Sequence, residues 1–196
     1  MGLKQLWLFL FVLLYFVSEV CVDCIAYIEP NINLNISKIA TKFEFTNLKC
    51  SCPIKEFCTV DYCYLKSVNR TYKYASIRIN VFATVTNVEV NGETFKRMNG
   101  YKPFLYNVTV DGCRFMENRN RNPVANYLFG FLGKYHNINH TCPYSHDIII
   151  DKLSIGHVND HMMEFLPFAI GSYLLQASFS IDGIRRLVLQ FYGTVS

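Results

Sequence analysis

The sequence has little tryptophan and only one long apolar run. Trp7 is the single tryptophan of the 196 residues, and it lies inside that run, which extends from Leu6 to Val17. No other stretch approaches the ~20 apolar residues that a membrane-spanning helix needs. We therefore expect no stable membrane anchor. Phenylalanine and tyrosine, present in 16 and 13 copies, must supply nearly all the large side chains of the core.

The sequence also lacks the motifs that mark common catalytic sites. It has no GxSxG elbow, no HExxH pair and no glycine-rich phosphate loop. Its five histidines are interpreted as surface or turn residues, although they could be combined with nearby aspartates in many ways. These histidines are His136, His140, His146, His157 and His161. We expect no catalytic residue, no enzyme and no cofactor, and a hydrolase stays as a third alternative.

The apolar run near the start is typical of a signal peptide, because it follows Lys4 and is too short for a bilayer. Residues 1–24 are assigned to the signal, with cleavage between 20 and 26 left open, and residues 25–196 to one secreted, extracellular domain. That domain keeps 18 basic and 13 acidic side chains, a net charge of +5. The charge is spread out, so a solvated face is favoured and no nucleic-acid partner is expected.

Six cysteines follow the signal, an even number that suits disulfides in a secreted protein. They are Cys50, Cys52, Cys58, Cys63, Cys113 and Cys142. Six cysteines allow 15 pairings; loop size weakly favours pairs within 50–63, which leaves Cys113 for Cys142. Zinc is the competing use, given the spacing of His136, His140, Cys142 and His146, but no CxxC pair follows residue 24. We expect no metal.

Four glycosylation sequons follow the signal, at Asn35, Asn69, Asn107 and Asn139. Four such sites in a chain with its own secretion signal favour a glycoprotein. If Asn107 carries a glycan, its side chain faces solvent, and this constrains the strand around it.

Most of the chain shows the alternation of apolar and polar residues that is typical of half-buried strands. In residues 104–111, Phe104, Tyr106, Val108 and Val110 share one face. Similar runs cover 42–48, 173–181 and 187–191, and the run 72–90 is long enough to bend or break. Asn91-Gly92 predicts a tight hairpin turn, with 94–98 returning to a second turn at Asn99-Gly100, and Asp182-Gly183 predicts another hairpin. The apolar run between Asp147 and Asp151 is interpreted as a buried strand.

One segment has helical spacing instead. After Asn122-Pro123, a plausible N-cap and first helical residue, apolar residues recur every three or four positions through Tyr135. They predict one amphipathic helix near 123–135, either packed over the sheet edge or serving as a mobile, ligand-contacting cover. The predicted fold is mainly β, an immunoglobulin-like antiparallel β-sandwich with this one helix.

A series of phrases from residue 42 onward resembles a known family. These are "KFEFTNLKC", "CYLKSVNRTYKYAS", "NGYKPFLYNVTVDGCRF", "NPVANYLF", "NINHTCPYSHDIIIDKL" and "GSYLL" followed by "DGIRR". They resemble a large insect family of secreted proteins catalogued only as a domain of unknown function. That family is similar in turn to the insect Che-type chemosensory proteins and, more distantly, to the ganglioside-activator and other proteins of the ML lipid-recognition superfamily.

The resemblance implies an ML-like sandwich whose two sheets can part to hold a hydrophobic ligand. It also implies that Cys50, Cys63, Cys113 and Cys142 form the family framework, with an extra local bridge between Cys52 and Cys58. The stretch "LPFAIGSYLL" departs from the family pattern at Phe168, Ala169 and Ile170. This apolar loop is either ordinary packing or part of a cavity mouth.

Two functions are expected from different classes. The first is a carrier that binds a hydrophobic small molecule or lipid between its sheets. A chemosensory role, in which the carrier meets an extracellular receptor, is one expectation for it. The second is a protein-protein interaction module with a filled core and no ligand. An enclosed apolar cavity of ~300 Å³ or more would favour the carrier. Its candidate lining residues are Phe104, Tyr106, Val108, Val110, Leu128, Phe131, Tyr173, Leu175 and Phe179.

Overall fold

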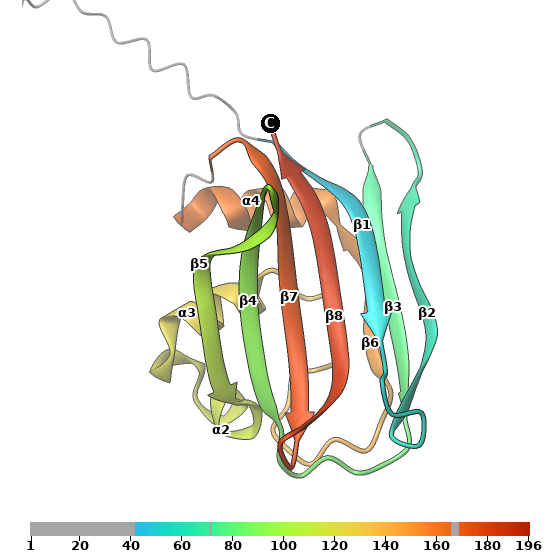
Figure 1. Ribbon diagram of the computed structural model, residues 1–196. Helices are drawn as coiled ribbons and strands as arrows, with labels where there is room; N and C mark the ends of the chain where they lie inside the picture. Colours follow the sequence, from blue (N-terminus) through green and yellow to red (C-terminus); the bar gives the residue numbers. More distant parts are fainter. Residues whose placement is uncertain (1–41, 71, 166–168) are drawn as a thin grey trace, which may run out of the picture. The chain divides into compact units, whose positions relative to one another are not determined.

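The computed structural model describes residues 42–70, 72–165 and 169–196 (Figure 1). The expected signal peptide, the Asn35 sequon and Phe168 lie outside the described residues. In the described part, eight strands form two antiparallel sheets. The larger has the order β1 (Phe43–Ser51), β8 (Ile184–Val195), β7 (Gly171–Ile181), β4 (Glu89–Met98), β5 (Gly100–Asp111). The smaller has the order β2 (Cys58–Ser67), β3 (Lys73–Val81), β6 (Ile148–Ser154). The prediction of a mainly β sandwich is confirmed.

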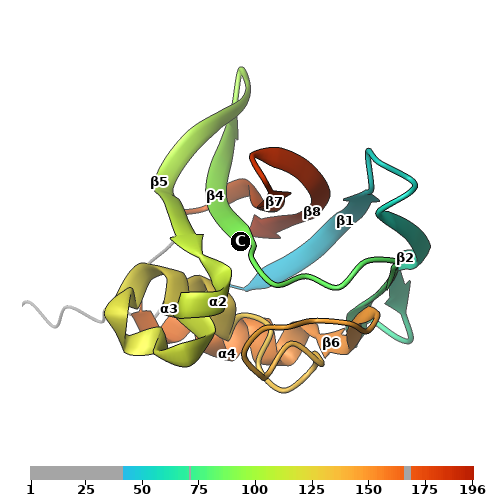
Figure 2. The same ribbon diagram turned by 90° about the horizontal axis from the view of Figure 1, so that it is seen from below.

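Helices complete the layer that faces the larger sheet (Figure 2). They are α2 (Gly112–Glu117), the 3-10 turn η1 (Arg119–Arg121), α3 (Pro123–Gly130) and α4 (Ile155–Phe165). The side chain of Asn159 fastens α4 to β1, because it accepts from the Phe43 amide at 2.6 Å and donates to the Phe43 carbonyl at 3.1 Å. The three-stranded sheet and these helices together bury one face of the larger sheet.

The strands follow the apolar alternation. In β8, inward positions such as Leu187, Leu189 and Val195 are buried, while their neighbours are partly exposed. Ile77 and Ile79 of β3 are fully buried at the centre of the smaller sheet. The long run 72–90 breaks after Val81, and the hairpin at Asp182-Gly183 forms, both as predicted.

The prediction of a hairpin turn at Asn91-Gly92 is wrong. Both residues lie inside β4, which continues to Met98 before the tight turn at Asn99-Gly100. Gly92 serves packing instead, since a Cβ placed there would lie 3.0 Å from Leu128 Cδ1 of α3. A glycine within a strand often marks such a close approach.

The prediction of one helix over 123–135 is correct at its start and wrong at its end. The Asn122 side chain caps α3 by accepting from the Ala125 amide at 3.0 Å, and Pro123 begins the helix. The helix ends at Gly130, and Gly133 then adopts a positive φ of 52°. The described residues also contain α2 and α4, which the periodicity did not predict.

Three disulfides are present among the described residues, and they decide a pairing that the sequence left open. Cys50 of β1 pairs with Cys63 of β2, so this bond joins the two sheets. Cys52 pairs with Cys58 within the β1–β2 connection, and Cys113 pairs with Cys142.

The two faces of β5 differ as the alternation predicted. Val108 and Val110 are half-buried, whereas Asn107 and Thr109 are exposed. We expect Val108→Asp to abolish folding and secretion, because it places a carboxylate in the apolar interior, whereas Asn107→Gln should only remove a glycan. Secreted yield and electrophoretic mobility measure both effects, and equal tolerance of the two changes would contradict the assigned faces.

Gly193 of β8 is required by the ring of Phe43, which occupies the place of a side chain at this position. We expect Gly193→Ala to lower the free energy of unfolding by about 3 kcal/mol through overpacking. The matched control is Gly156→Ala in α4, where the nearest atom to a new Cβ is Ser154 Oγ at 4.0 Å. Denaturant unfolding should show the control unchanged or slightly more stable; equal stabilities of the two variants would contradict the packing.

Candidate ligand-binding cavity

A cavity of about 260 Å³ lies between the two layers. Its walls come from the larger sheet, from β6 and from helices α2, α3 and α4, and they are almost wholly apolar. Its volume is slightly below the ~300 Å³ expected for a carrier. The core is nevertheless not filled, whereas the interaction-module hypothesis required a filled core.

Seven of the nine residues proposed from the sequence line this cavity. They are Val108, Val110, Leu128, Phe131, Tyr173, Leu175 and Phe179. The structure thus brings together side chains from β5, α3 and β7 that are far apart in the sequence. Whether they contact a ligand stays a prediction.

Phe104 and Tyr106 do not line the cavity. The Phe104 ring packs against Tyr173 at 5.9 Å between ring centroids, and the Tyr106 ring packs against Tyr127 at the same distance. Between them the pairing of β4 and β5 is irregular, and Leu105 has a φ of 66°. Simple alternation could not place these side chains, because an irregularity changes where a strand directs its residues.

Sequence reasoning missed the wall that α4 supplies. Val158 and Met162 of this helix line the cavity, as does Leu153 at the end of β6. Ile155, Val158 and Met162 do recur at helical spacing. Polar residues between them weakened that signal, although Ser154, whose Oγ accepts from the His157 amide at 3.2 Å, was a cap signal at the start of the helix.

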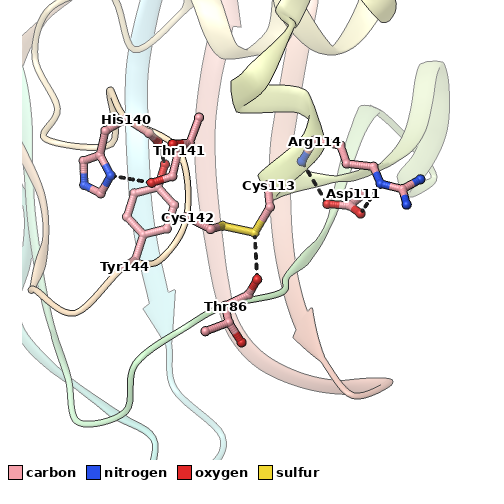
Figure 3. Close-up of a disulfide and its surroundings, with 8 residues drawn as sticks. All are labelled: Thr86, Asp111, Cys113, Arg114, His140, Thr141, Cys142 and Tyr144. Carbon is pink, nitrogen blue, oxygen red and sulfur yellow. Dashed lines mark hydrogen bonds and ion pairs between the residues drawn. A yellow bond between two sulfur atoms is a disulfide. The ribbon is translucent and has the colours of Figure 1, made fainter.

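The Cys113–Cys142 disulfide ties together two segments of the cavity wall (Figure 3). Phe115 follows Cys113 in α2, and Tyr144 follows Cys142; both line the cavity. A third segment joins them, because Val85 and Tyr144 exchange backbone hydrogen bonds of 2.8 and 2.9 Å. The disulfide therefore holds part of the cavity wall in place.

The turn into α2 fixes the position of Cys113. Asp111, the last residue of β5, caps the helix by accepting from the Arg114 amide at 3.1 Å (Figure 3). The Arg114 guanidinium also lies 3.5 Å from the Asp111 carboxylate. Strand, cap and disulfide follow one another within three residues.

Two histidines join α4 to the end of α3. His161 Nε2 lies 2.8 Å from the Tyr127 carbonyl oxygen, and His157 Nε2 lies 3.2 Å from that of Gly130. Gly130 leaves room for this contact, since a Cβ there would lie 2.5 Å from His161 Cε1. The interpretation of these two histidines as surface or turn residues is wrong, because they are half-buried between helices.

The histidines and cysteine considered for zinc do not assemble a site. Cys142 is in a disulfide, and the Nε2 atoms of His140 and His146 face each other at 2.7 Å, a hydrogen-bond distance. Over residues 42–70, 72–165 and 169–196, no group of three or more His, Cys, Asp or Glu side chains is placed to hold a metal.

A family comparison covers the middle of this structure. Residues 90–175 match a family model described as "Protein of unknown function (DUF1091)". The chain contains a DUF1091 domain. This domain extends from β4 to β7 and includes the Cys113–Cys142 disulfide and six of the seven cavity-lining candidates, with Phe179 beyond its end.

No curated protein matches the chain. Among the described residues, no helix is both long enough and apolar enough to cross a membrane.

His136 stands beside the cavity wall formed by the DUF1091 domain. Its ring packs edge-on against Phe129, which lines the cavity, with 4.9 Å between centroids. Its Nδ1 accepts a hydrogen bond from the Ile138 amide at 3.0 Å. Burial lowers the pKa of His136 below its ordinary 6.5, and the charge of Arg119 lowers it further.

This lowered pKa predicts a loss of stability in mild acid. Above pH 6.5 the ring is neutral in both folded and unfolded chains, whereas below it the unfolded chain binds the proton first and unfolding is favoured. Urea unfolding should show a smaller decrease in stability from pH 7.5 to 5.5 in His136→Asn, which keeps an acceptor but does not titrate. Parallel profiles for wild type and His136→Asn would contradict the assignment.

Proposed function

We propose that the protein is a secreted, disulfide-bonded glycoprotein that binds a hydrophobic small molecule or lipid between its two layers. The observation that carries this proposal is the cavity of about 260 Å³ with apolar walls from both layers. Burying a ligand there removes apolar surface from water, which contributes about 0.8 kcal/mol for each methylene group.

The cavity volume bounds the size of the ligand. A methylene group needs about as much space as a water molecule in the liquid, ~30 Å³, so 260 Å³ holds a chain of about nine carbons. Medium-chain lipids and small hydrocarbons fit this bound without any movement of the layers.

Three disulfides support the extracellular part of the proposal, because such bonds persist in oxidising compartments. The sequon residues Asn69, Asn107 and Asn139 are exposed, as glycan attachment requires. The family resemblance adds a chemosensory role, in which the loaded protein meets an extracellular receptor. The filled interaction module is disfavoured, since the core contains a cavity.

The proposed function is tested by identifying any hydrophobic molecule bound to the purified protein. We expect protein purified from a secreting host to release a lipid or hydrocarbon on denaturation, detected by mass spectrometry, or to bind 1-decanol in a calorimetric titration. An empty protein that binds no such probe would overturn the proposed function. The assay cannot use tryptophan quenching, because the only tryptophan is Trp7.

A cavity-filling variant locates the binding site. Ala177 of β7 lines the cavity, and Ala177→Phe should weaken 1-decanol binding at least tenfold because its ring takes the space of the ligand. Val60→Phe, at an exposed position of β2, is the control and should bind as wild type. Equal affinities for a correctly folded Ala177→Phe and wild type would place the ligand elsewhere.

A further inference from the structure

Two adjacent arginines near the start of β8 have different surroundings. In the pairing with β7, Leu187 faces Phe179 and Arg185 faces Ser180, so Arg186 is an extra residue at an irregularity. Such a bulge changes the direction of a side chain. Arg185 is exposed, whereas Arg186 is half-buried and lines the cavity.

The Arg186 side chain has an unsatisfied donor. Its guanidinium carbon lies 5.6 Å from the ring centroid of Phe57, which also lines the cavity. Its Nε is shielded from solvent and has no hydrogen-bond partner. No carboxylate of the described residues forms an ion pair with it. A buried N–H without an acceptor is unfavourable, and a ligand acceptor would remove that cost.

The other polar side chains of the wall are already engaged within the protein. They are Thr94, Tyr144, His146, Tyr173 and Gln176, each hydrogen-bonded to another protein group. Among the described lining residues, Arg186 is therefore the cationic side chain and the one with a donor left for a ligand.

We propose that the ligand is an amphiphile with an anionic end, a medium-chain carboxylate, whose chain fills the cavity and whose carboxylate binds Arg186. The planar guanidinium can donate from Nε and one terminal nitrogen to the two oxygens of a carboxylate. A ten-carbon acid fits the volume, since its carboxylate lies at Arg186 and nine carbons remain for the cavity. This inference rests on the proposed function and names the ligand class.

The test compares decanoate with 1-decanol, which has the same chain and no charge. Calorimetric titration of the full secreted protein should give at least tenfold tighter binding of decanoate by wild type. Arg186→Gln should lose that preference and keep the affinity for 1-decanol. Arg185→Gln, which changes the exposed neighbour by the same chemistry, should retain the preference.

Arg186→Lys provides a second variant with the same charge and no planar fork, and it should show a reduced preference. This variant keeps the test valid if Arg186→Gln does not fold. If wild type binds both probes equally, or if a folded Arg186 variant keeps the full preference, the proposal of an anionic ligand is wrong. The proposal of a hydrophobic carrier is then retained. If wild type binds neither probe, the carrier itself fails.

Discussion

The inner face of the larger sheet is wider than the sheet that covers it. Five strands face three, and with neighbouring strands ~4.8 Å apart about two strand widths remain to be buried by something else. Helices α3 and α4, each ~10 Å across, supply that cover (Figure 2). The cavity lies between the larger sheet and this mixed layer.

Covalent bonds fix the two ends of this arrangement. Cys50–Cys63 holds the sheets together through β1 and β2, two strands that are joined directly in sequence but belong to different sheets. Cys113–Cys142 holds α2 against the segment that contains Tyr144. The walls on either side of the cavity are therefore held in place. The same bonds lower the conformational entropy of the unfolded chain, and this stabilises the folded domain.

Periodicity predicted the strands and most of the cavity wall, because alternation decides which residues face inward. Periodicity failed at residues whose placement depends on contacts with other segments of the chain. Gly92 resembled a turn residue, but it accommodates Leu128 of α3. Phe104 and Tyr106 lie beside an irregularity of the strand, and Arg186 faces the cavity because of another. Neither irregularity has a local sequence signal, since each depends on how two consecutive strands pair across a hairpin.

An apolar cavity binds hydrophobic molecules but discriminates poorly between them, since one methylene group changes the free energy of transfer by only about 0.8 kcal/mol. The volume sets a limit on chain length, and polar groups must supply any finer selection. In this wall nearly all the polar groups form hydrogen bonds within the protein, so they have none to offer to a particular ligand. Arg186 differs because its Nε has no partner. In the proposed carrier, selection would therefore depend on chain length and on the chemistry of the ligand end that reaches this side chain.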